Sequence, residues 1–144
     1  MLNTYLKKES IQIMDRVENV DQAITLCGQQ LIDQGCIDER YVDSMKSTYA
    51  QYGPYMVLID KVALFHGKPG IGVTQTAMSL TALKEPYPIP DHDKSIQLCF
   101  AFSSLDNQQH MEMIRCFAQL LMDTERLNAL LEAKTIEEIY QIIQ

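Results

Sequence analysis

The spacing of apolar residues changes twice along this chain, and this change limits the fold more than any other feature. Residues 20–34 repeat apolar side chains at intervals of three and four, as an amphipathic helix does, and residues 39–51 are expected to form a second helix. Short apolar or alternating runs then predict strands, at 55–59, 62–65, 76–83 and 96–103. The chain ends in helical spacing, in a helix after Asp106 and in stretches near 124–132 and 135–143.

Helices, then strands, then helices again predict an α/β fold: a mixed β-sheet of about four or five strands sandwiched between helices on both faces. The links between the strands are too short for regular βαβ crossovers, which need a dozen residues or more. A chain of 144 residues is long enough to bury one core, so we expect a single domain over residues 1–144.

Local patterns add three structural expectations. In 96–103 the even-numbered residues should face one way and the odd-numbered residues the other, because side chains alternate along a strand. The prolines of 84–94 predict an exposed extended loop or an edge strand, since proline cannot donate a hydrogen bond within a sheet. The inner face of the helix after Asp106 is expected to comprise Ile114, Phe117, Ala118 and Leu121.

Composition excludes several classes of partner and site. A net charge of −7 argues against nucleic acid, whose phosphates require clustered lysine and arginine. No apolar run approaches the ~20 residues that span a bilayer, and the first residues do not resemble a signal peptide, so we expect a cytoplasmic protein. The four cysteines form no C-x-x-C pair and share no ligand spacing with histidine, which predicts reduced thiols and no metal.

One histidine, His66, stands where a predicted strand enters a glycine-rich turn. The apolar run 62–65 precedes it, and Gly67, Gly70 and Gly72 follow. Glycine lets main-chain N–H groups approach an anion closely, so Gly67 is a candidate phosphate-binding residue. These parts suit a histidine that accepts a phosphoryl group. They also suit an ordinary strand-end histidine followed by turn glycines, and the pattern by itself leaves both interpretations open.

The chain contains two other histidines. His110 is expected in the first turn of the helix after Asp106, beside unpaired N–H groups and the positive end of the helix dipole, where an anion is stabilised. A core histidine bonded to a carbonyl is the alternative interpretation. His92 lies between Asp91 and Asp93 in the proline-rich segment, and we expect it to be solvated and without a functional role.

If the ends of the strands that precede them are neighbours, His66 and His110 meet over one site. One imidazole can then accept a phosphoryl group while the other donates a hydrogen bond to its oxygens, because this chemistry depends mainly on positioning and charge stabilisation. The unprotonated ring nitrogen is a competent nucleophile near neutral pH. A Walker A loop and a Rossmann fingerprint are missing from the sequence, so ATP and NAD are not expected as cofactors.

Several short motifs resemble, in the same order, those of enzyme IIA components of the phosphoenolpyruvate-dependent sugar phosphotransferase system. The resemblance is to the mannitol/fructose superfamily, and particularly to its ascorbate-type branch. It covers nearly the whole chain. The motifs are Gly-Pro-Tyr at 53–55, Ala-Leu-Phe-His-Gly-Lys-Pro at 63–69, Leu-Lys-Glu-Pro at 83–86, Asp-Asn-Gln-Gln-His at 106–110 and Leu-Leu-Glu-Ala-Lys-Thr-Ile-Glu-Glu-Ile at 130–139.

The resemblance implies that His66 is the phosphorylated residue and that His110 is the second active-site histidine. It implies HPr as phosphoryl donor, a cysteine of enzyme IIB as acceptor and, indirectly, a membrane enzyme IIC. Such a phosphotransferase supports uptake and phosphorylation of a sugar or sugar acid, of the ascorbate or related pentitol type, and needs no cofactor. A homodimer is left open. The alternative function is that of a regulatory module, whose phosphorylation at His66 controls binding to another protein rather than transport.

The sequence departs from the family pattern at two places. Phe65 stands where proline commonly precedes the active histidine, which changes local backbone stiffness but keeps the nucleophile. The mannitol branch carries an upstream arginine that assists the phosphoryl group, and residues 46–52 offer none, which favours the ascorbate-type branch. We also expect Phe65, Tyr55 and the loop after Gly67 to surround His66 with a largely uncharged docking surface.

Overall fold

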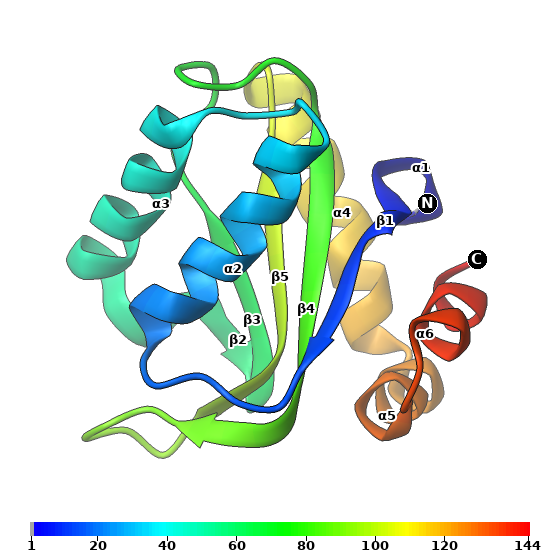
Figure 1. The fold of residues 1–144 in the computed structure, drawn as a ribbon. Helices are drawn as coiled ribbons and strands as arrows, with labels where there is room; N and C mark the ends of the chain where they lie inside the picture. Colours follow the sequence, from blue (N-terminus) through cyan, green and yellow to red (C-terminus); the bar gives the residue numbers. More distant parts are fainter. Residues whose placement is uncertain (1) are drawn as a thin grey trace.

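Five strands form one sheet in the computed structural model, which describes residues 2–144 (Figure 1). The strand order is β1–β4–β5–β3–β2, with β1/β4 and β5/β3 parallel and the other two pairs antiparallel. The predicted mixed sheet of four or five strands is therefore confirmed. The strands are β1 (Leu6–Met14), β2 (Val57–Ile59), β3 (Lys61–His66), β4 (Ala77–Pro88) and β5 (Ser95–Ser103).

Helices cover both faces of this sheet, as predicted. α2 and α3 pack on one face, and α4, α5 and α6 lie on the other (Figure 1). Each face has its own apolar core, so the central strands β4 and β5 are buried on both sides. The helices are α1 (Leu2–Tyr5), α2 (Val20–Asp33), α3 (Glu39–Tyr52), the 3₁₀ helix η1 (Gly53–Met56), α4 (Asn107–Met122), α5 (Thr124–Glu132) and α6 (Ile136–Ile143).

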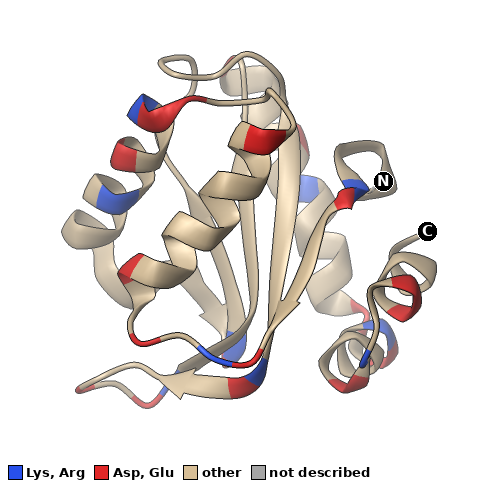
Figure 2. Cartoon of the chain, viewed as in Figure 1, with Lys and Arg blue, Asp and Glu red and all other residues tan. Residues whose placement is uncertain are grey.

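Charged side chains lie on the helices and the loops, near the start of β1, at the start of β3 and in the part of β4 that leaves the centre of the sheet, whereas β5 carries none (Figure 2). This distribution agrees with burial on both faces, where an unpaired charge would be costly. Within residues 2–144, no helix is long and apolar enough to cross a membrane.

Local capping explains where the helices begin and end. The Asn19 side chain accepts a hydrogen bond from the N–H of Gln22, and Asp106 accepts one from the N–H of Gln109, as N-caps do. After α2, Gly35 adopts a positive φ of 72°, and the N–H groups of Gly35 and Cys36 return to the carbonyls of the last turn. The predicted bounds of α2 and the predicted start of α4 after Asp106 are confirmed.

Two strands differ from their predicted bounds, and one was missed. The Tyr55–Met56 segment belongs to η1, so β2 begins only at Val57. β4 continues through the prolines to Pro88. Its last part has β5 on one side only, which is the edge-strand setting that proline tolerates. β1 escaped prediction because its charged residues and a register shift between Leu6 and Ile11 obscure any alternation.

Two predicted faces also need correction. On β3, Lys61 and Val62 pair with Ile96 and Leu98, so a bulge places one extra residue, Gln97, in β5. Ile96 consequently joins the core under α2 and α3, whereas Leu98 joins the core on the other face. On α4 the buried stripe is rotated: Ala118 is exposed, Ile114 and Leu121 are partly buried, and the fully buried residues are Met113, Phe117 and Leu120.

Candidate functional site

His66 is the last residue of β3, and its ring lies on the sheet face that carries α4. It pairs in parallel register with Phe102 of β5. The two rings stack with centroids 5.1 Å apart and planes inclined by 21°. The preceding residue, Phe65, faces the opposite way and packs edge-on against Tyr49 of α3 at 6.2 Å. Alternation along β3 therefore separates the histidine from its apolar neighbour.

His110 comes from the first turn of α4 and meets His66 over the same end of the sheet. The two imidazole centroids are 5.5 Å apart, with their planes inclined by 67°. The ring of Phe102 also contacts His110, at 5.1 Å. Three rings thus form one cluster at the carboxyl ends of β3 and β5. The prediction that His66 and His110 lie close together over one site is confirmed.

The hydrogen bonding of His66 fixes which ring nitrogen is available. Its Nδ1 lies 3.0 Å from the carbonyl oxygen of Leu64, and a carbonyl only accepts, so Nδ1 carries the proton. Nε2 of the neutral ring then holds the free lone pair. Burial lowers the pKa of His66, and nearby His110 lowers it further, while the Leu64 carbonyl opposes this shift. A neutral, nucleophilic imidazole near pH 7 follows.

His110 is less buried and more loosely held. Burial lowers its pKa as well. Its Nδ1 lies 3.4 Å from the hydroxyl oxygen of Ser104, which is fully buried. If Ser104 donates to Nδ1, then Nε2 of His110 carries the proton and is a hydrogen-bond donor for an anion held between the two rings.

Tyr41 of α3 is a supporting residue that sequence reasoning missed. It is fully buried, and its hydroxyl donates to the carbonyl of Phe102 at 2.7 Å and accepts from the N–H of Gly67 at 2.9 Å. Burial raises the pKa of Tyr41 to about 12, so the hydroxyl stays protonated. The Tyr41 side chain therefore holds in place both Gly67, which follows His66, and Phe102, whose ring contacts both histidines. A tyrosine on the apolar face of the predicted helix 39–51 was the available signal.

The glycines after His66 permit close contact with α3. A Cβ at Gly67 would lie 2.5 Å from the Ser44 hydroxyl oxygen, and Gly72, at a φ of 78°, would meet the Tyr41 nitrogen at 2.7 Å. The Ser44 hydroxyl also accepts from the N–H of Lys68 at 3.1 Å. The N–H of Gly67 is already bonded to Tyr41, so a phosphoryl oxygen would have to share it. Phosphate binding by Gly67 stays a prediction.

Exposed apolar side chains come from the segments that flank the three rings. Ile71 is 72% exposed in the loop after His66, Leu105 is 45% exposed just before α4, and Met111 is 56% exposed beside His110. This surface differs from the predicted one. Phe65 is fully buried and cannot contribute to it. Tyr55 instead lines a small hollow with the loop 92–94.

The segment 67–76 is tied to the α4 side of the site by its own hydrogen bonds. The Thr76 hydroxyl donates to the Gln109 side chain and accepts from the N–H of Leu105 at 3.1 Å, and the N–H of Gly70 donates to the Ser104 carbonyl at 3.2 Å. Such bonds hold the residues around the two histidines in place before any ligand arrives. No three His, Cys, Asp or Glu side chains among residues 2–144 gather closely enough to hold a metal ion.

Comparisons with known proteins agree with this geometry. The family model for the phosphoenolpyruvate-dependent sugar phosphotransferase system, EIIA 2, matches residues 4–144. The solution structure of the mannitol-specific cryptic phosphotransferase enzyme IIA from Escherichia coli is 31% identical, with a TM-score of 0.89 over 99% of this chain and 97% of that one.

Two further relatives extend the comparison. The ascorbate-specific phosphotransferase system EIIA component of Escherichia coli (strain K12) is 26% identical over 139 residues, which are 95% of this chain and 90% of the relative. The complex of mannitol enzyme IIA with phosphorylated enzyme IIB from Escherichia coli contains a chain of the same fold. It is 20% identical, with a TM-score of 0.81 over 94% of each chain.

Proposed function

This chain belongs to the EIIA 2 family of the phosphoenolpyruvate-dependent sugar phosphotransferase system, and we propose that His66 accepts a phosphoryl group from HPr and passes it to a cysteine of the cognate enzyme IIB. Proteins of this family are phosphotransferase components that carry phosphoryl groups within the system. The observation that supports His66 most directly is its Nδ1–Leu64 hydrogen bond, which leaves Nε2 unprotonated and half-buried beside His110.

The reaction consists of two displacements at phosphorus. In the first, the Nε2 lone pair of His66 attacks the phosphorus, and the bond between phosphorus and the HPr histidine breaks, returning its electron pair to that nitrogen. In the second, the enzyme IIB thiolate attacks the same phosphorus and the bond to Nε2 breaks. The proton stays on Nδ1 throughout, donated to the Leu64 carbonyl oxygen, so the ring keeps its orientation in both steps.

His110 has the role of a donor to the transferred group. A proton on its Nε2 can bond a phosphoryl oxygen, and the positive end of the α4 dipole lies beside it. The N–H of Gly67 is a second candidate donor, in competition with the Tyr41 hydroxyl. Phe102 contributes no polar group but holds both imidazoles at a fixed spacing.

The apolar surface of Ile71, Leu105 and Met111 suits brief docking of two partners in turn. Small interfaces of this kind allow fast dissociation. Enzyme IIB as acceptor is supported by the Escherichia coli complex, in which a protein of the same fold binds phosphorylated enzyme IIB. A carrier that receives its phosphoryl group from HPr and passes it to enzyme IIB is expected to act in the cytoplasm. It would affect the membrane enzyme IIC only through enzyme IIB.

The ascorbate or related pentitol type is the substrate class that we propose for the system. Residues 46–52 carry no arginine that could assist the phosphoryl group as in the mannitol branch, and a relative named for ascorbate matches 95% of the chain. A relative named as a mannitol-specific cryptic phosphotransferase enzyme IIA matches as well, at 31% identity, so the proposed substrate class rests on the missing arginine.

A phosphorylation relay tests the whole proposal. The purified chain is incubated with phosphoenolpyruvate, enzyme I and HPr, and intact-mass analysis should show one added phosphoryl group. Candidate enzyme IIB proteins are then added separately, and transfer to an ascorbate-type enzyme IIB is expected. Transfer to a mannitol-type enzyme IIB alone would overturn the substrate class. Retention of the label against every enzyme IIB of the same genome would favour the regulatory alternative.

A further inference from the structure

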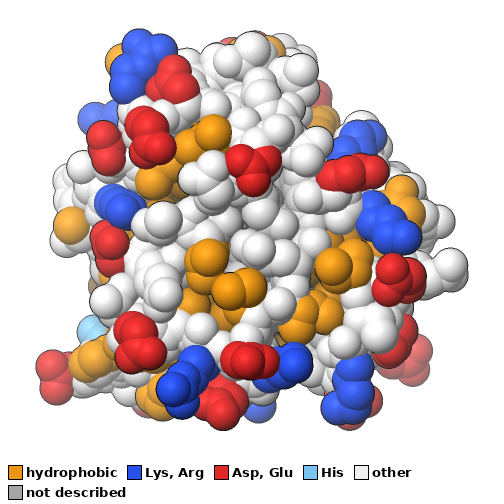
Figure 3. Space-filling model, viewed as in Figure 1, with side chains coloured by type: hydrophobic (Ala, Val, Ile, Leu, Met, Phe, Trp, Pro, Cys, Tyr) orange, Lys and Arg blue, Asp and Glu red, His pale blue; other side chains and the backbone are white. Residues whose placement is uncertain are grey.

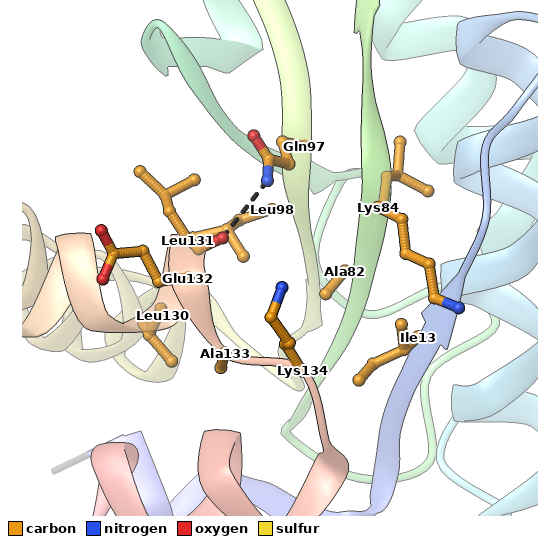
Figure 4. Close-up of a pocket in the computed structure, with 11 residues that line it drawn as sticks. Ile13, Ala82, Lys84, Gln97, Leu98, Leu130, Leu131, Glu132, Ala133 and Lys134 are labelled. Atoms are coloured by element: carbon orange, nitrogen blue, oxygen red, sulfur yellow. Dashed lines mark hydrogen bonds between the residues drawn. The ribbon is translucent and has the colours of Figure 1, made fainter.

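A broad hollow lies at the opposite end of the sheet from His66. It has a volume of about 820 Å³ and opens between β1, β4 and β5 and the link from α5 to α6 (Figure 4). Its floor is mainly apolar, with Ile13, Ala82, Leu98 and Leu130 among its lining residues. The volume falls within the ~300–1,000 Å³ range of small-molecule sites. Phosphoryl transfer at His66 does not use this region.

Lys134 is the charged group that enters the hollow. Figure 4 shows its ammonium directed inward, toward the strands, whereas Glu132 directs its carboxylate away. Lys84 is on the rim and pairs with Asp15 at 3.2 Å. No ion pair or hydrogen bond joins the Lys134 side chain to any other residue within 2–144. An unpaired cation therefore stands above an apolar floor.

The rest of the wall is held in place without Lys134. The Gln97 side chain, placed by the bulge in β5, donates to the Leu131 carbonyl at 3.4 Å and ties the end of α5 to the sheet (Figure 4). Figure 3 shows small groups of apolar side chains exposed among acidic and basic ones on the face that it presents. The Gln97 contact holds the end of α5 against the strands that line the hollow.

We propose that this hollow binds a small amphiphilic carboxylate, a molecule with an apolar body and one anionic head. The body covers Ala82, Leu98 and the neighbouring apolar wall, and the head pairs with the Lys134 ammonium. On a protein with a net charge of −7, a local cation favours the binding of an anion at this place. A neutral ligand would leave Lys134 unpaired, and a small hydrophilic anion would leave the floor in water.

The test compares three probes by ¹H–¹⁵N NMR on the full chain: octanoate, 1-octanol and acetate. Octanoate should produce saturable shifts at the amides of Leu83, Gln97, Ala133 and Lys134. Octanol shares its apolar body and acetate its charge, so each should bind more weakly than octanoate. Equal binding of octanol, or octanoate shifts that do not saturate or that fall only around Ile71 and Leu105, would overturn the proposal.

Variants separate the contributions of charge and shape. Lys134→Met keeps the length of the side chain and should weaken octanoate binding by roughly three- to tenfold, the effect of one partly exposed ion pair. Lys7→Met, at an exposed lysine of β1, is the matched control and should leave binding unchanged. Ala82→Leu should reduce octanoate binding, because the larger side chain fills part of the hollow. Wild-type affinity in Lys134→Met would contradict the assigned role of its ammonium, whether or not Ala82→Leu folds.

Discussion

The two ends of the sheet carry histidines in opposite settings. At the carboxyl ends of β3 and β5, His66 and His110 share the ring of Phe102, and burial lowers the pKa of both. At the other end, His92 is exposed in the loop between β4 and β5. Its backbone N–H bonds to the Ile89 carbonyl at 3.2 Å, and its ring is not part of any cluster.

The difference shows what converts a histidine into a phosphoryl acceptor. All three residues have the same intrinsic chemistry, but only at one end does the fold fix a tautomer, exclude part of the water and bring a second imidazole within reach. The supporting bonds come from α3 through Tyr41 and from the 67–76 segment. The loop that carries His92 offers none of these constraints, so it serves as an internal reference.

Replacing one histidine at a time should reveal the largest difference between the two ends of the sheet. His66→Ala removes the only nucleophile that we assign, so phosphorylation by phosphoenolpyruvate, enzyme I and HPr should be abolished. His92→Ala, the matched control, should be phosphorylated at the wild-type rate. Intact-mass analysis of both variants provides the measurement. Normal labelling of His66→Ala would refute the assignment of the phosphorylated residue.

His110→Ala should have the next largest effect. Without this donor the transferred phosphoryl group loses one positioned interaction, and transfer should slow by roughly 10²–10³-fold. Intact-mass analysis of samples quenched at successive times gives the rate of phosphoryl transfer from HPr. His110→Gln retains a side-chain N–H donor and should recover part of the rate. A wild-type rate in His110→Ala would show that the second imidazole is only a structural neighbour.

Tyr41→Phe tests whether the α3 contact positions the site. Loss of the hydroxyl leaves the Phe102 carbonyl and the Gly67 N–H unpaired in a buried place, which should lower the free energy of unfolding by about 1–3 kcal/mol. Since both groups adjoin the histidines, we expect transfer to slow by about tenfold, the equivalent of about 1.4 kcal/mol. Urea titration and the HPr transfer assay measure the two effects.

Tyr49→Phe is the control for that experiment, because Tyr49 lies on the same helix and contacts Phe65 through its ring. It should change neither quantity appreciably. If Tyr41→Phe lowers stability but transfers at the wild-type rate, then Tyr41 supports the fold and not the geometry of the site.

Sequence reasoning succeeded where the deciding interactions are local. Asn19 and Asp106 bond to N–H groups three residues away, so the starts of α2 and α4 were readable from the residues themselves. The positions of His66 at a strand end and His110 in a first turn are local in the same sense. That they meet depends on β3 pairing in parallel with β5, a long-range arrangement that sequence could only state as a condition.

The features that sequence reasoning did not predict are decided by long-range contacts. The Tyr41 hydroxyl bonds to residues 61 and 26 positions away, which no spacing rule reveals. Phe65 was assigned to the docking surface by its proximity in sequence, although alternation along β3 turns it toward α3. β1 is an edge strand with charged residues, whose pairing with β4 is decided by the rest of the sheet.

The smallest expected effect concerns pH. Burial lowers the pKa of His66 below its ordinary value of 6.5, so the native ring should titrate below pH 6.5 while the unfolded chain in urea titrates near it. As pH falls through 6.5, the unfolded state takes up a proton before the native state does. The free energy of unfolding should therefore decrease with falling pH, and above pH 6.5 this contribution should vanish. Transfer from HPr should decline at lower pH, as the pH falls through the native midpoint of His66, because protonation of the native ring removes the Nε2 lone pair. NMR titration of the ring protons gives the midpoint, and His66→Gln should lose part of the pH dependence of stability. A native midpoint at or above 6.5 would contradict burial as the source of the neutral nucleophile.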